Sequence, residues 1–215
     1  MIFIVQTCPP RYPSPLLRQL VRQRDPLPAG PGIAPVRDNT GAGQLATMLR
    51  AFVGAGELGC PLTLLEDDVE VCADFVPFVL GHWRDPGMEV VQWYAPGTLP
   101  ADASVNACGW RVEADGGGFG YLQATTFSPE FVRALLDYPG LGSFRRMHKH
   151  DGDRLVGEVL FSHGWRYAIR VPGGAQHTGA DSLIHVHQNP LRRNRIEQAG
   201  IVSRHYVGRD GRMGG

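Results

Sequence analysis

The stretch from Leu62 to Glu70 constrains the fold of this chain more than any other part of the sequence. Its first four residues are apolar or β-branched, and Glu66, Asp67 and Asp68 follow them directly. Such a run predicts a buried strand, because it is too short for a helix of its own. Open α/β sheets bind ligands outside the carboxyl ends of their strands. Three carboxylates there repel one another, so we expect a divalent cation among them, shared with substrate phosphates. The other interpretation is a solvated acidic turn or a set of helix-capping acids.

The rest of the chain alternates predicted strands with predicted helices. The clearest helix spans residues 43–56, where apolar residues recur on one face. Further helices are expected at 15–24, 74–83, 128–138 and 153–163, and strands at 2–6, 62–65, 89–94 and 165–171, with a short strand or loop at 36–40 and paired strands at 110–113 and 119–127. This order predicts an α/β fold, with a mixed, mostly parallel sheet and helices on both faces.

Length and charge divide the chain into a body and a tail. The 215 residues, 43% of them hydrophobic, suffice for one domain, which we place at residues 1–189. The body holds 15 basic and 19 acidic side chains, whereas residues 190–215 hold six arginines and two acids. The basic tail could track nucleic acid phosphates, close over a bound diphosphate as a lid, or be a solvated end.

Nothing in the sequence predicts a membrane span or a secretion signal. No apolar run approaches the roughly 20 residues that cross a bilayer, and residues 1–5 lack the basic start of a signal peptide. We therefore expect a soluble cytoplasmic protein, in the host-cell cytoplasm if the chain is viral. The four cysteines, Cys8, Cys60, Cys72 and Cys108, show no C-x-x-C spacing, so neither a zinc site nor disulfides are expected.

Three sequence features follow one another along residues 1–182. The apolar strand runs into Glu66-Asp67-Asp68, a strand after Gly120 leads into Ser128-Pro129, and a late helix from Asp153 precedes Gln176-His177-Thr178-Gly179. Together they resemble a GT-A-type glycosyltransferase. The likeness is greatest to the small enzymes related to bacterial lipopolysaccharide glycosyltransferases that carry a Glu-Asp-Asp motif. The resemblance implies a single GT-A-like, Rossmann-like domain.

The resemblance also implies roles on the donor side. Mn2+ or Mg2+ would bind with a nucleotide-sugar, and Asp68 would be the direct metal ligand. Glu66 and Asp67 would contact the ribose or the donor sugar. His177 would supply a second metal contact, although it could equally be a structural histidine or bond a diphosphate oxygen.

The nucleotide, which we expect to be UDP, should lie near the end of the first strand. Thr7 and Arg11 follow that strand and could meet the base or the phosphates. Asp38 could bond the uracil or the ribose. Residues of these types in surface loops commonly have no such role.

The acceptor side needs a base if the transfer inverts the configuration at the anomeric carbon of the sugar. Asp153 is the first choice, because it opens the late helix and could take the proton of the attacking hydroxyl. Asp151 is the rival, and either could simply cap the helix.

The expected function is therefore sugar transfer to an acceptor hydroxyl. The acceptor is either a saccharide or a hydroxymethylated base in DNA. A metal-dependent nucleotidyl- or phosphotransferase is the alternative enzyme. It usually has a glycine-rich loop after a strand, whereas residues 54–59 precede one. A non-catalytic binding module is the third possibility.

Overall fold

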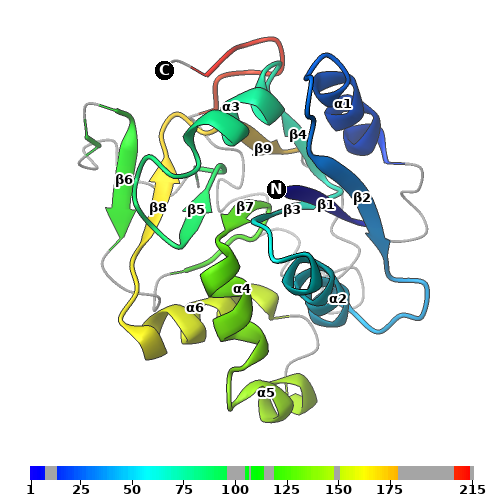
Figure 1. Cartoon of the computed structure of the whole chain (residues 1–215), viewed down its shortest axis with the longest axis vertical. Coiled ribbons are helices and arrows are strands. Elements are labelled where there is room, and N and C mark those ends of the chain that lie inside the picture. Colours follow the sequence, from blue (N-terminus) through cyan, green and yellow to red (C-terminus); the bar gives the residue numbers. More distant parts are fainter. Residues whose placement is uncertain are drawn as a thin grey trace, which may run out of the picture.

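The computed structural model describes residues 1–7, 14–95, 105–106, 108–113, 119–147, 151–178 and 206–213. Its centre is a seven-stranded sheet with the strand order β2-β1-β3-β7-β5-β8-β6, and a two-stranded sheet pairs β4 with β9 (Figure 1). The strands are β1 (Ile2–Thr7), β2 (Gly32–Arg37), β3 (Leu62–Glu66), β4 (Val69–Val71), β5 (Val90–Gln92), β6 (Trp110–Glu113), β7 (Ala124–Phe127), β8 (Tyr167–Arg170) and β9 (Ala175–His177). The helices are α1 (Pro15–Arg24), α2 (Gln44–Leu58), α3 (Phe75–His82), α4 (Pro129–Leu136), α5 (Leu141–Met147) and α6 (Gly152–His163).

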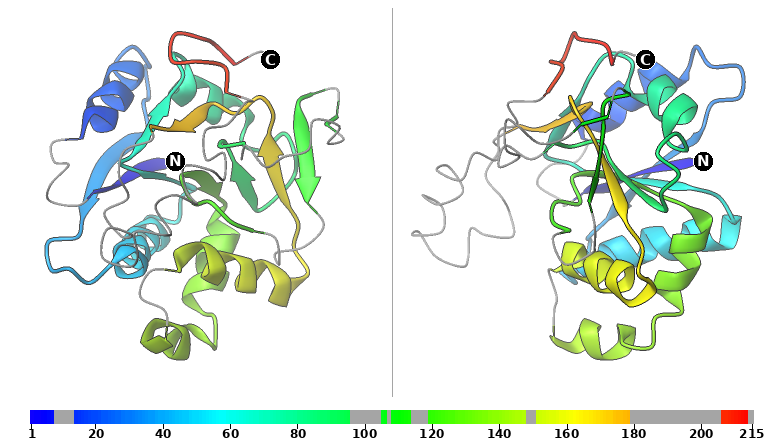
Figure 2. Two further views of the ribbon diagram at one scale, coloured as in Figure 1. Left: turned by 180° about the vertical axis from the view of Figure 1, so that it is seen from behind. Right: turned by 90° about the vertical axis from the view of Figure 1, so that its left-hand side faces the viewer.

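The large sheet is mixed and mostly parallel. β1, β2, β3, β5 and β8 run in one direction, and β7 and β6 run against them. One apolar core packs α2, α4, α5 and α6 on one face of the sheet, and a second packs α1 and α3 on the other (Figures 1 and 2). The α/β fold with helices on both faces is thus confirmed.

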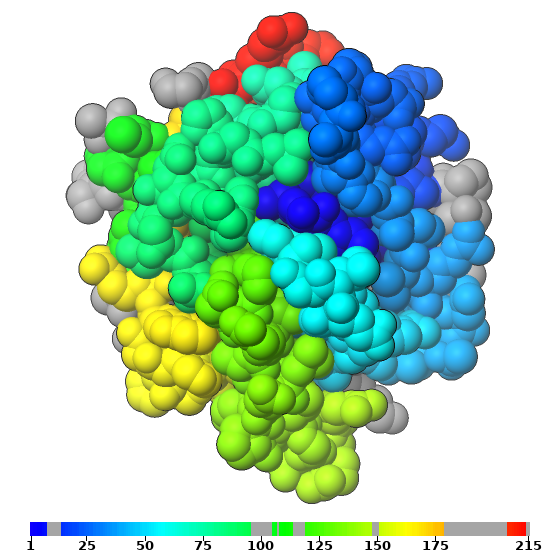
Figure 3. Space-filling model, viewed as in Figure 1, coloured from blue at the N-terminus to red at the C-terminus, as the bar shows by residue number. Residues whose placement is uncertain are grey.

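Local signals in the sequence account for the start of α4 and the end of α2. The Ser128 hydroxyl accepts a hydrogen bond from the Phe131 N–H at 3.0 Å, which caps α4, and Pro129 occupies the first turn. Gly59 ends α2 in the left-handed conformation with φ of 58°. α2 and α4 lie side by side on one face of the molecule (Figure 3), where the Phe52 and Phe131 rings are 6.4 Å apart.

Three expectations about the strands and helices were wrong in detail. β6 pairs with β8 and not with the segment at 119–127, whose strand β7 lies between β3 and β5. The glycine-rich residues 115–118 predicted a hairpin, but Trp110 packs its ring 5.5 Å from that of Trp93, which holds β6 at the far edge. The helix α5 and the small β4–β9 sheet were not expected. β2 begins at Gly32, earlier than the predicted 36–40 segment.

Part of the predicted tail packs on the domain. The Val207 N–H donates to the Gly173 carbonyl at 3.3 Å, and the Ala73 N–H donates to the Gly211 carbonyl at 3.1 Å. Met213 is buried in the core that contains α1 and α3. Residues 206–213 are therefore attached by the backbone and by apolar burial, while the other tail residues lie outside the described ranges. Every helix in those ranges falls short of the length and apolar character that crossing a membrane requires.

Candidate active site

The site begins where β1 and β3 end side by side. These strands are parallel, with Gln6 opposite Glu66. Side chains alternate along a strand, so Glu66 faces the same side as Leu62 and Leu64, toward α2. There the amide of Gln44 donates to the Glu66 carboxylate, and the Gln6 amide donates to the Gln44 carbonyl at 3.1 Å. The first residue of α2 is thereby tied to both strand ends.

The carboxylates predicted for the site come together in space. Burial and the charges of Asp68, Asp153 and Asp67 together raise the pKa of Glu66 to about 8, against the hydrogen bond from Gln44. Glu66 therefore senses a carboxylate from the distant helix α6 as well as its two neighbours in the motif. Such a field disfavours further negative charge and favours a cation.

Asp68 and His177 meet because β4 and β9 pair. Val69 lies opposite His177 in this antiparallel pair, and the Thr178 N–H donates to the Asp68 carbonyl at 2.8 Å. Asp68 Oδ2 lies 3.4 Å from His177 Nε2, and both side chains are about nine-tenths buried. The acidic motif and the late histidine are thus fixed together by the backbone.

The spacing of these two side chains suits one shared divalent cation. Two adjacent ligands of an octahedral ion at ~2.1 Å lie about 3 Å apart, close to the observed 3.4 Å. No group of three or more His, Cys, Asp or Glu side chains in the described ranges could hold a metal. A cation held by Asp68 and His177 would therefore need further oxygen ligands from a substrate or water, as Mg2+ commonly has.

Asp153 reaches the site from the first turn of α6. That helix approaches closely because Gly152 has no side chain: a Cβ there would lie 2.9 Å from the Met48 sulfur and 3.0 Å from Leu122. Burial and Asp151 raise the pKa of Asp153, and the N–H groups of Arg154 and Tyr121 act in the opposite direction. Asp153 also lines an open pocket of about 500 Å3. Asp151 occupies the N-cap position without a side-chain capping hydrogen bond.

The residues predicted to contact the nucleotide have different surroundings in the structure. Thr7 is 3% exposed, and its hydroxyl has no hydrogen-bond partner within the described residues. Asp38 accepts hydrogen bonds from the Ala42 and Gly43 N–H groups, both at 2.9 Å. Burial acts to raise the pKa of Asp38, but these backbone groups and Arg50 outweigh it and lower that pKa. Asp38 thus organises the loop into α2, and its nucleotide contact stays a prediction. Arg11 lies outside the described residues.

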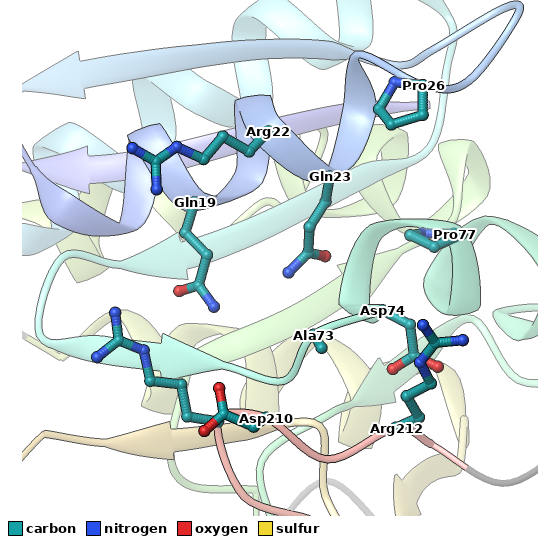
Figure 4. A pocket seen from close by; sticks show the side chains of 10 residues that line it. Gln19, Arg22, Gln23, Pro26, Ala73, Asp74, Pro77, Asp210 and Arg212 are labelled. Carbon is teal, nitrogen blue, oxygen red and sulfur yellow. The ribbon is translucent and has the colours of Figure 1, made fainter.

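Two of the tail arginines line a separate hollow. Arg209 and Arg212 share a pocket of about 470 Å3 with Arg22 and other residues of α1, α3 and the C-terminal segment. Figure 4 shows Gln19 and Gln23 extending from α1 toward it, with Asp210 and Arg212 on the opposite side. The lining residue Ala73 follows β4, whereas Asp68 precedes it. This pocket therefore lies at the other end of β4 from the Asp68–His177 pair.

Sequence reasoning missed the amide side chains that organise the site. Gln44 bridges the ends of β1 and β3, and the buried Gln92 binds the segment before β7. The one available signal was a glutamine at the end of the apolar run at 90–92, since a polar residue there needs a buried partner. For Gln44, the sequence offered only a helix start.

Comparisons with known proteins give a broad likeness of structure. The sequence matches no protein-family profile, and no curated protein is significantly similar to it. The structure is similar to the A197 protein from STIV, with 15% identity over 81% of this chain and 82% of that chain and a TM-score of 0.47. It is also similar to mannose-1-phosphate geranyltransferase from Thermus thermophilus (14% identity, 79% of this chain and 72% of that chain, TM-score 0.43). UDP-glucose pyrophosphorylase from Acinetobacter baumanii is similar too (12% identity, 85% and 73%, TM-score 0.43). At this level of similarity, function has to be inferred from the site itself.

Proposed function

We propose that this protein is a metal-dependent glycosyltransferase that moves a sugar from a nucleotide-sugar, expected to be UDP-linked, to an acceptor hydroxyl. The observation that carries the proposal is the meeting of Asp68 and His177, 3.4 Å apart, beside the half-buried Glu66 and Asp153 of α6. Side chains that could hold a cation, face the donor and take a proton thus come from β3 and the turn after it, from β9 and from α6.

On the donor side, Asp68 and His177 would hold Mn2+ or Mg2+. The bound cation would stabilise the negative charge that grows on the diphosphate leaving group. Glu66 and Asp67 would face the ribose or the sugar. Thr7 adds a buried hydroxyl without a partner in the described part of the chain, which a nucleotide could satisfy.

On the acceptor side, Asp153 would act as the base. The acceptor oxygen attacks the anomeric carbon while the bond from that carbon to the diphosphate oxygen breaks, and the bonding pair leaves with the diphosphate. Asp153 takes the hydroxyl proton. Burial, which raises the pKa of Asp153, makes this carboxylate a stronger base than an ordinary aspartate.

The pocket at Asp153 favours a saccharide over DNA as the acceptor. Its lining includes Glu158, whose carboxylate accepts from the Tyr138 hydroxyl at 3.4 Å and pairs with Arg154 at 3.4 Å. Phe161 on its rim is 70% exposed. Because Arg154 offsets one of the two carboxylates, the lining keeps one excess negative charge beside an exposed aromatic ring, which suits a polyhydroxylated ligand better than a phosphate backbone.

The glycine-rich segment gives no support to the nucleotidyltransferase alternative. Residues 54–58 form the last part of α2, and Gly59 ends it. This stretch is a helix end and does not follow a strand as a phosphate-binding loop does.

A thermal-shift screen of nucleotide-sugars with and without Mn2+ tests the proposal. A matched donor at a hundredfold excess over its dissociation constant should stabilise the fold by about 2.7 kcal/mol. Asp68→Ala should abolish the Mn2+-dependent part, because it removes a charged ligand. Asp25→Ala is the control, since that exposed carboxylate pairs with its chain neighbour Arg24. Unchanged Mn2+-dependent stabilisation in Asp68→Ala would contradict the metal assignment.

A further inference from the structure

Tyr121 has an unusual backbone conformation beside the proposed base. Its φ is +78°, and it is the one residue other than glycine with a positive φ in the described ranges. Bulky side chains rarely adopt this region because Cβ crowds the backbone. Such strain persists only where surrounding contacts impose it, and it gathers at functional sites.

The contact that imposes this conformation is a buried amide. Gln92, at the end of β5, is 1% exposed, and its Nε2 donates to the carbonyls of both Gly120 and Tyr121 at 2.9 Å each. The Tyr121 ring also packs on Tyr94, with 5.7 Å between the ring centroids. Both carbonyls and the ring are therefore fixed from β5 and the residues that follow it.

The other side of the same residue faces α6. The Tyr121 N–H lies near enough to the Asp153 carboxylate to act against the rise in its pKa, and the next side chain, Leu122, lies against Gly152, the residue before Asp153. The φ angle sets the direction of the N–H relative to the remainder of the residue. With its carbonyl held by Gln92, the positive φ of Tyr121 turns its N–H toward Asp153.

We propose that Gln92 and Tyr121 are positioning residues, which hold the Asp153 carboxylate in the orientation needed to take the acceptor proton. The inference rests on the proposed function, in which Asp153 is the base. The tyrosine acts through its backbone conformation, and the glutamine acts by enforcing that conformation.

Substitutions that separate backbone from ring test the inference. Tyr121→Gly adopts a positive φ without strain and keeps the N–H, so it should retain most of kcat. Tyr121→Val disfavours a positive φ and should lower kcat by about 10- to 100-fold, the scale of a small misplacement of a catalytic group. Gln92→Met removes both amide hydrogen bonds at similar size and should lower kcat comparably. The KM for the nucleotide-sugar should stay unchanged in all three.

A double variant supplies the rescue. Tyr121→Gly placed in the Gln92→Met background should recover kcat, because glycine needs no enforcement. An equal loss in Tyr121→Gly and Tyr121→Val would overturn the inference and assign the role to the tyrosine ring. A failure of the double variant to recover would also overturn it, since Gln92 would then act through something other than Tyr121.

A readout without substrate separates this inference from the proposed function. The Tyr121 amide should exchange its hydrogen faster in both Asp153→Ala and Gln92→Met, as followed by NMR, with neighbouring amides of β7 unchanged. Unchanged exchange in both variants would overturn the inference whatever the reaction is. If exchange quickens but Asp153→Asn retains full kcat, the base assignment fails while the Gln92–Tyr121 contact stands.

Discussion

Replacement of Glu66 by glutamine should change how the stability of the metal-free protein depends on pH. The substitution keeps the size of the side chain and the oxygen that accepts from Gln44. It removes a carboxyl whose pKa is raised, by burial and by Asp68 before other causes, from an ordinary 4.5 to about 8. Glutamine thus mimics the protonated state at every pH.

The sign and the size follow from that raised pKa. The folded protein holds the Glu66 proton more tightly than the unfolded chain does. The contribution of protonated Glu66 to the free energy of unfolding is therefore fully present below about pH 4.5 and is lost as pH rises through about 8. A pKa unit corresponds to ~1.4 kcal/mol, which gives an upper limit of about 5 kcal/mol. Because Glu66 keeps some contact with water, we expect about 2–4 kcal/mol.

Urea unfolding in EDTA at pH 5, 7 and 9, followed by tryptophan fluorescence, would measure this difference. Wild type and Glu66→Gln should have similar free energies of unfolding at pH 5, and the variant should be the more stable at pH 9. Other titrating groups affect both proteins alike, so the difference between them isolates Glu66. Parallel free energies across the three pH values would refute the reasoning. Mg2+ should reduce the difference, since a cation at Asp68 lowers the pKa of nearby carboxyls.

Three further results are expected. Asp153→Asn should lower turnover by roughly 100-fold or more while donor binding survives; the same loss in Asp151→Asn alone would show, in steady-state kinetics, that Asp151 is the base. Met213→Ala should destabilise the fold by about 2–3 kcal/mol, because its side chain is buried in the core that contains Phe75, and denaturant unfolding would detect this. If the acceptor is a saccharide, replacing Arg209 and Arg212 by serine should leave DNA binding and the salt dependence of that binding unchanged. If the two arginines contact DNA phosphates, the slope against log salt should fall by about 1.8.

The strong local patterns predicted most of the elements. Apolar periodicity and the Ser128-Pro129 start located α4, and the apolar run at 62–65 located β3. The acidic motif after that strand and the late histidine were placed in one site from the sequence, and the structure does bring Asp68 and His177 together.

Long-range pairing and backbone strain escaped prediction for physical reasons. β4 and β9 have three residues each, too few for a period to show, yet their pairing sets the Asp68–His177 distance. The positive φ of Tyr121 leaves no trace in its neighbours, because Gln92 enforces it from a strand 29 residues earlier. The division of the chain at residue 189 stays a prediction.

The way the site treats its negative charge argues for a cationic ligand. The groups that shift the pKa of Glu66 are three carboxylates and the neutral amide of Gln44. Neutral amides satisfy carboxylate and carbonyl oxygens without cancelling charge, and Gln6 and Gln92 bind backbone carbonyls in the same way. An arginine in these places would stabilise the carboxylates internally and leave little field for a ligand. No cationic side chain of the described residues is among the causes that shift the pKa of Glu66, so under the proposed function a divalent ion that arrives with a diphosphate would supply the positive charge.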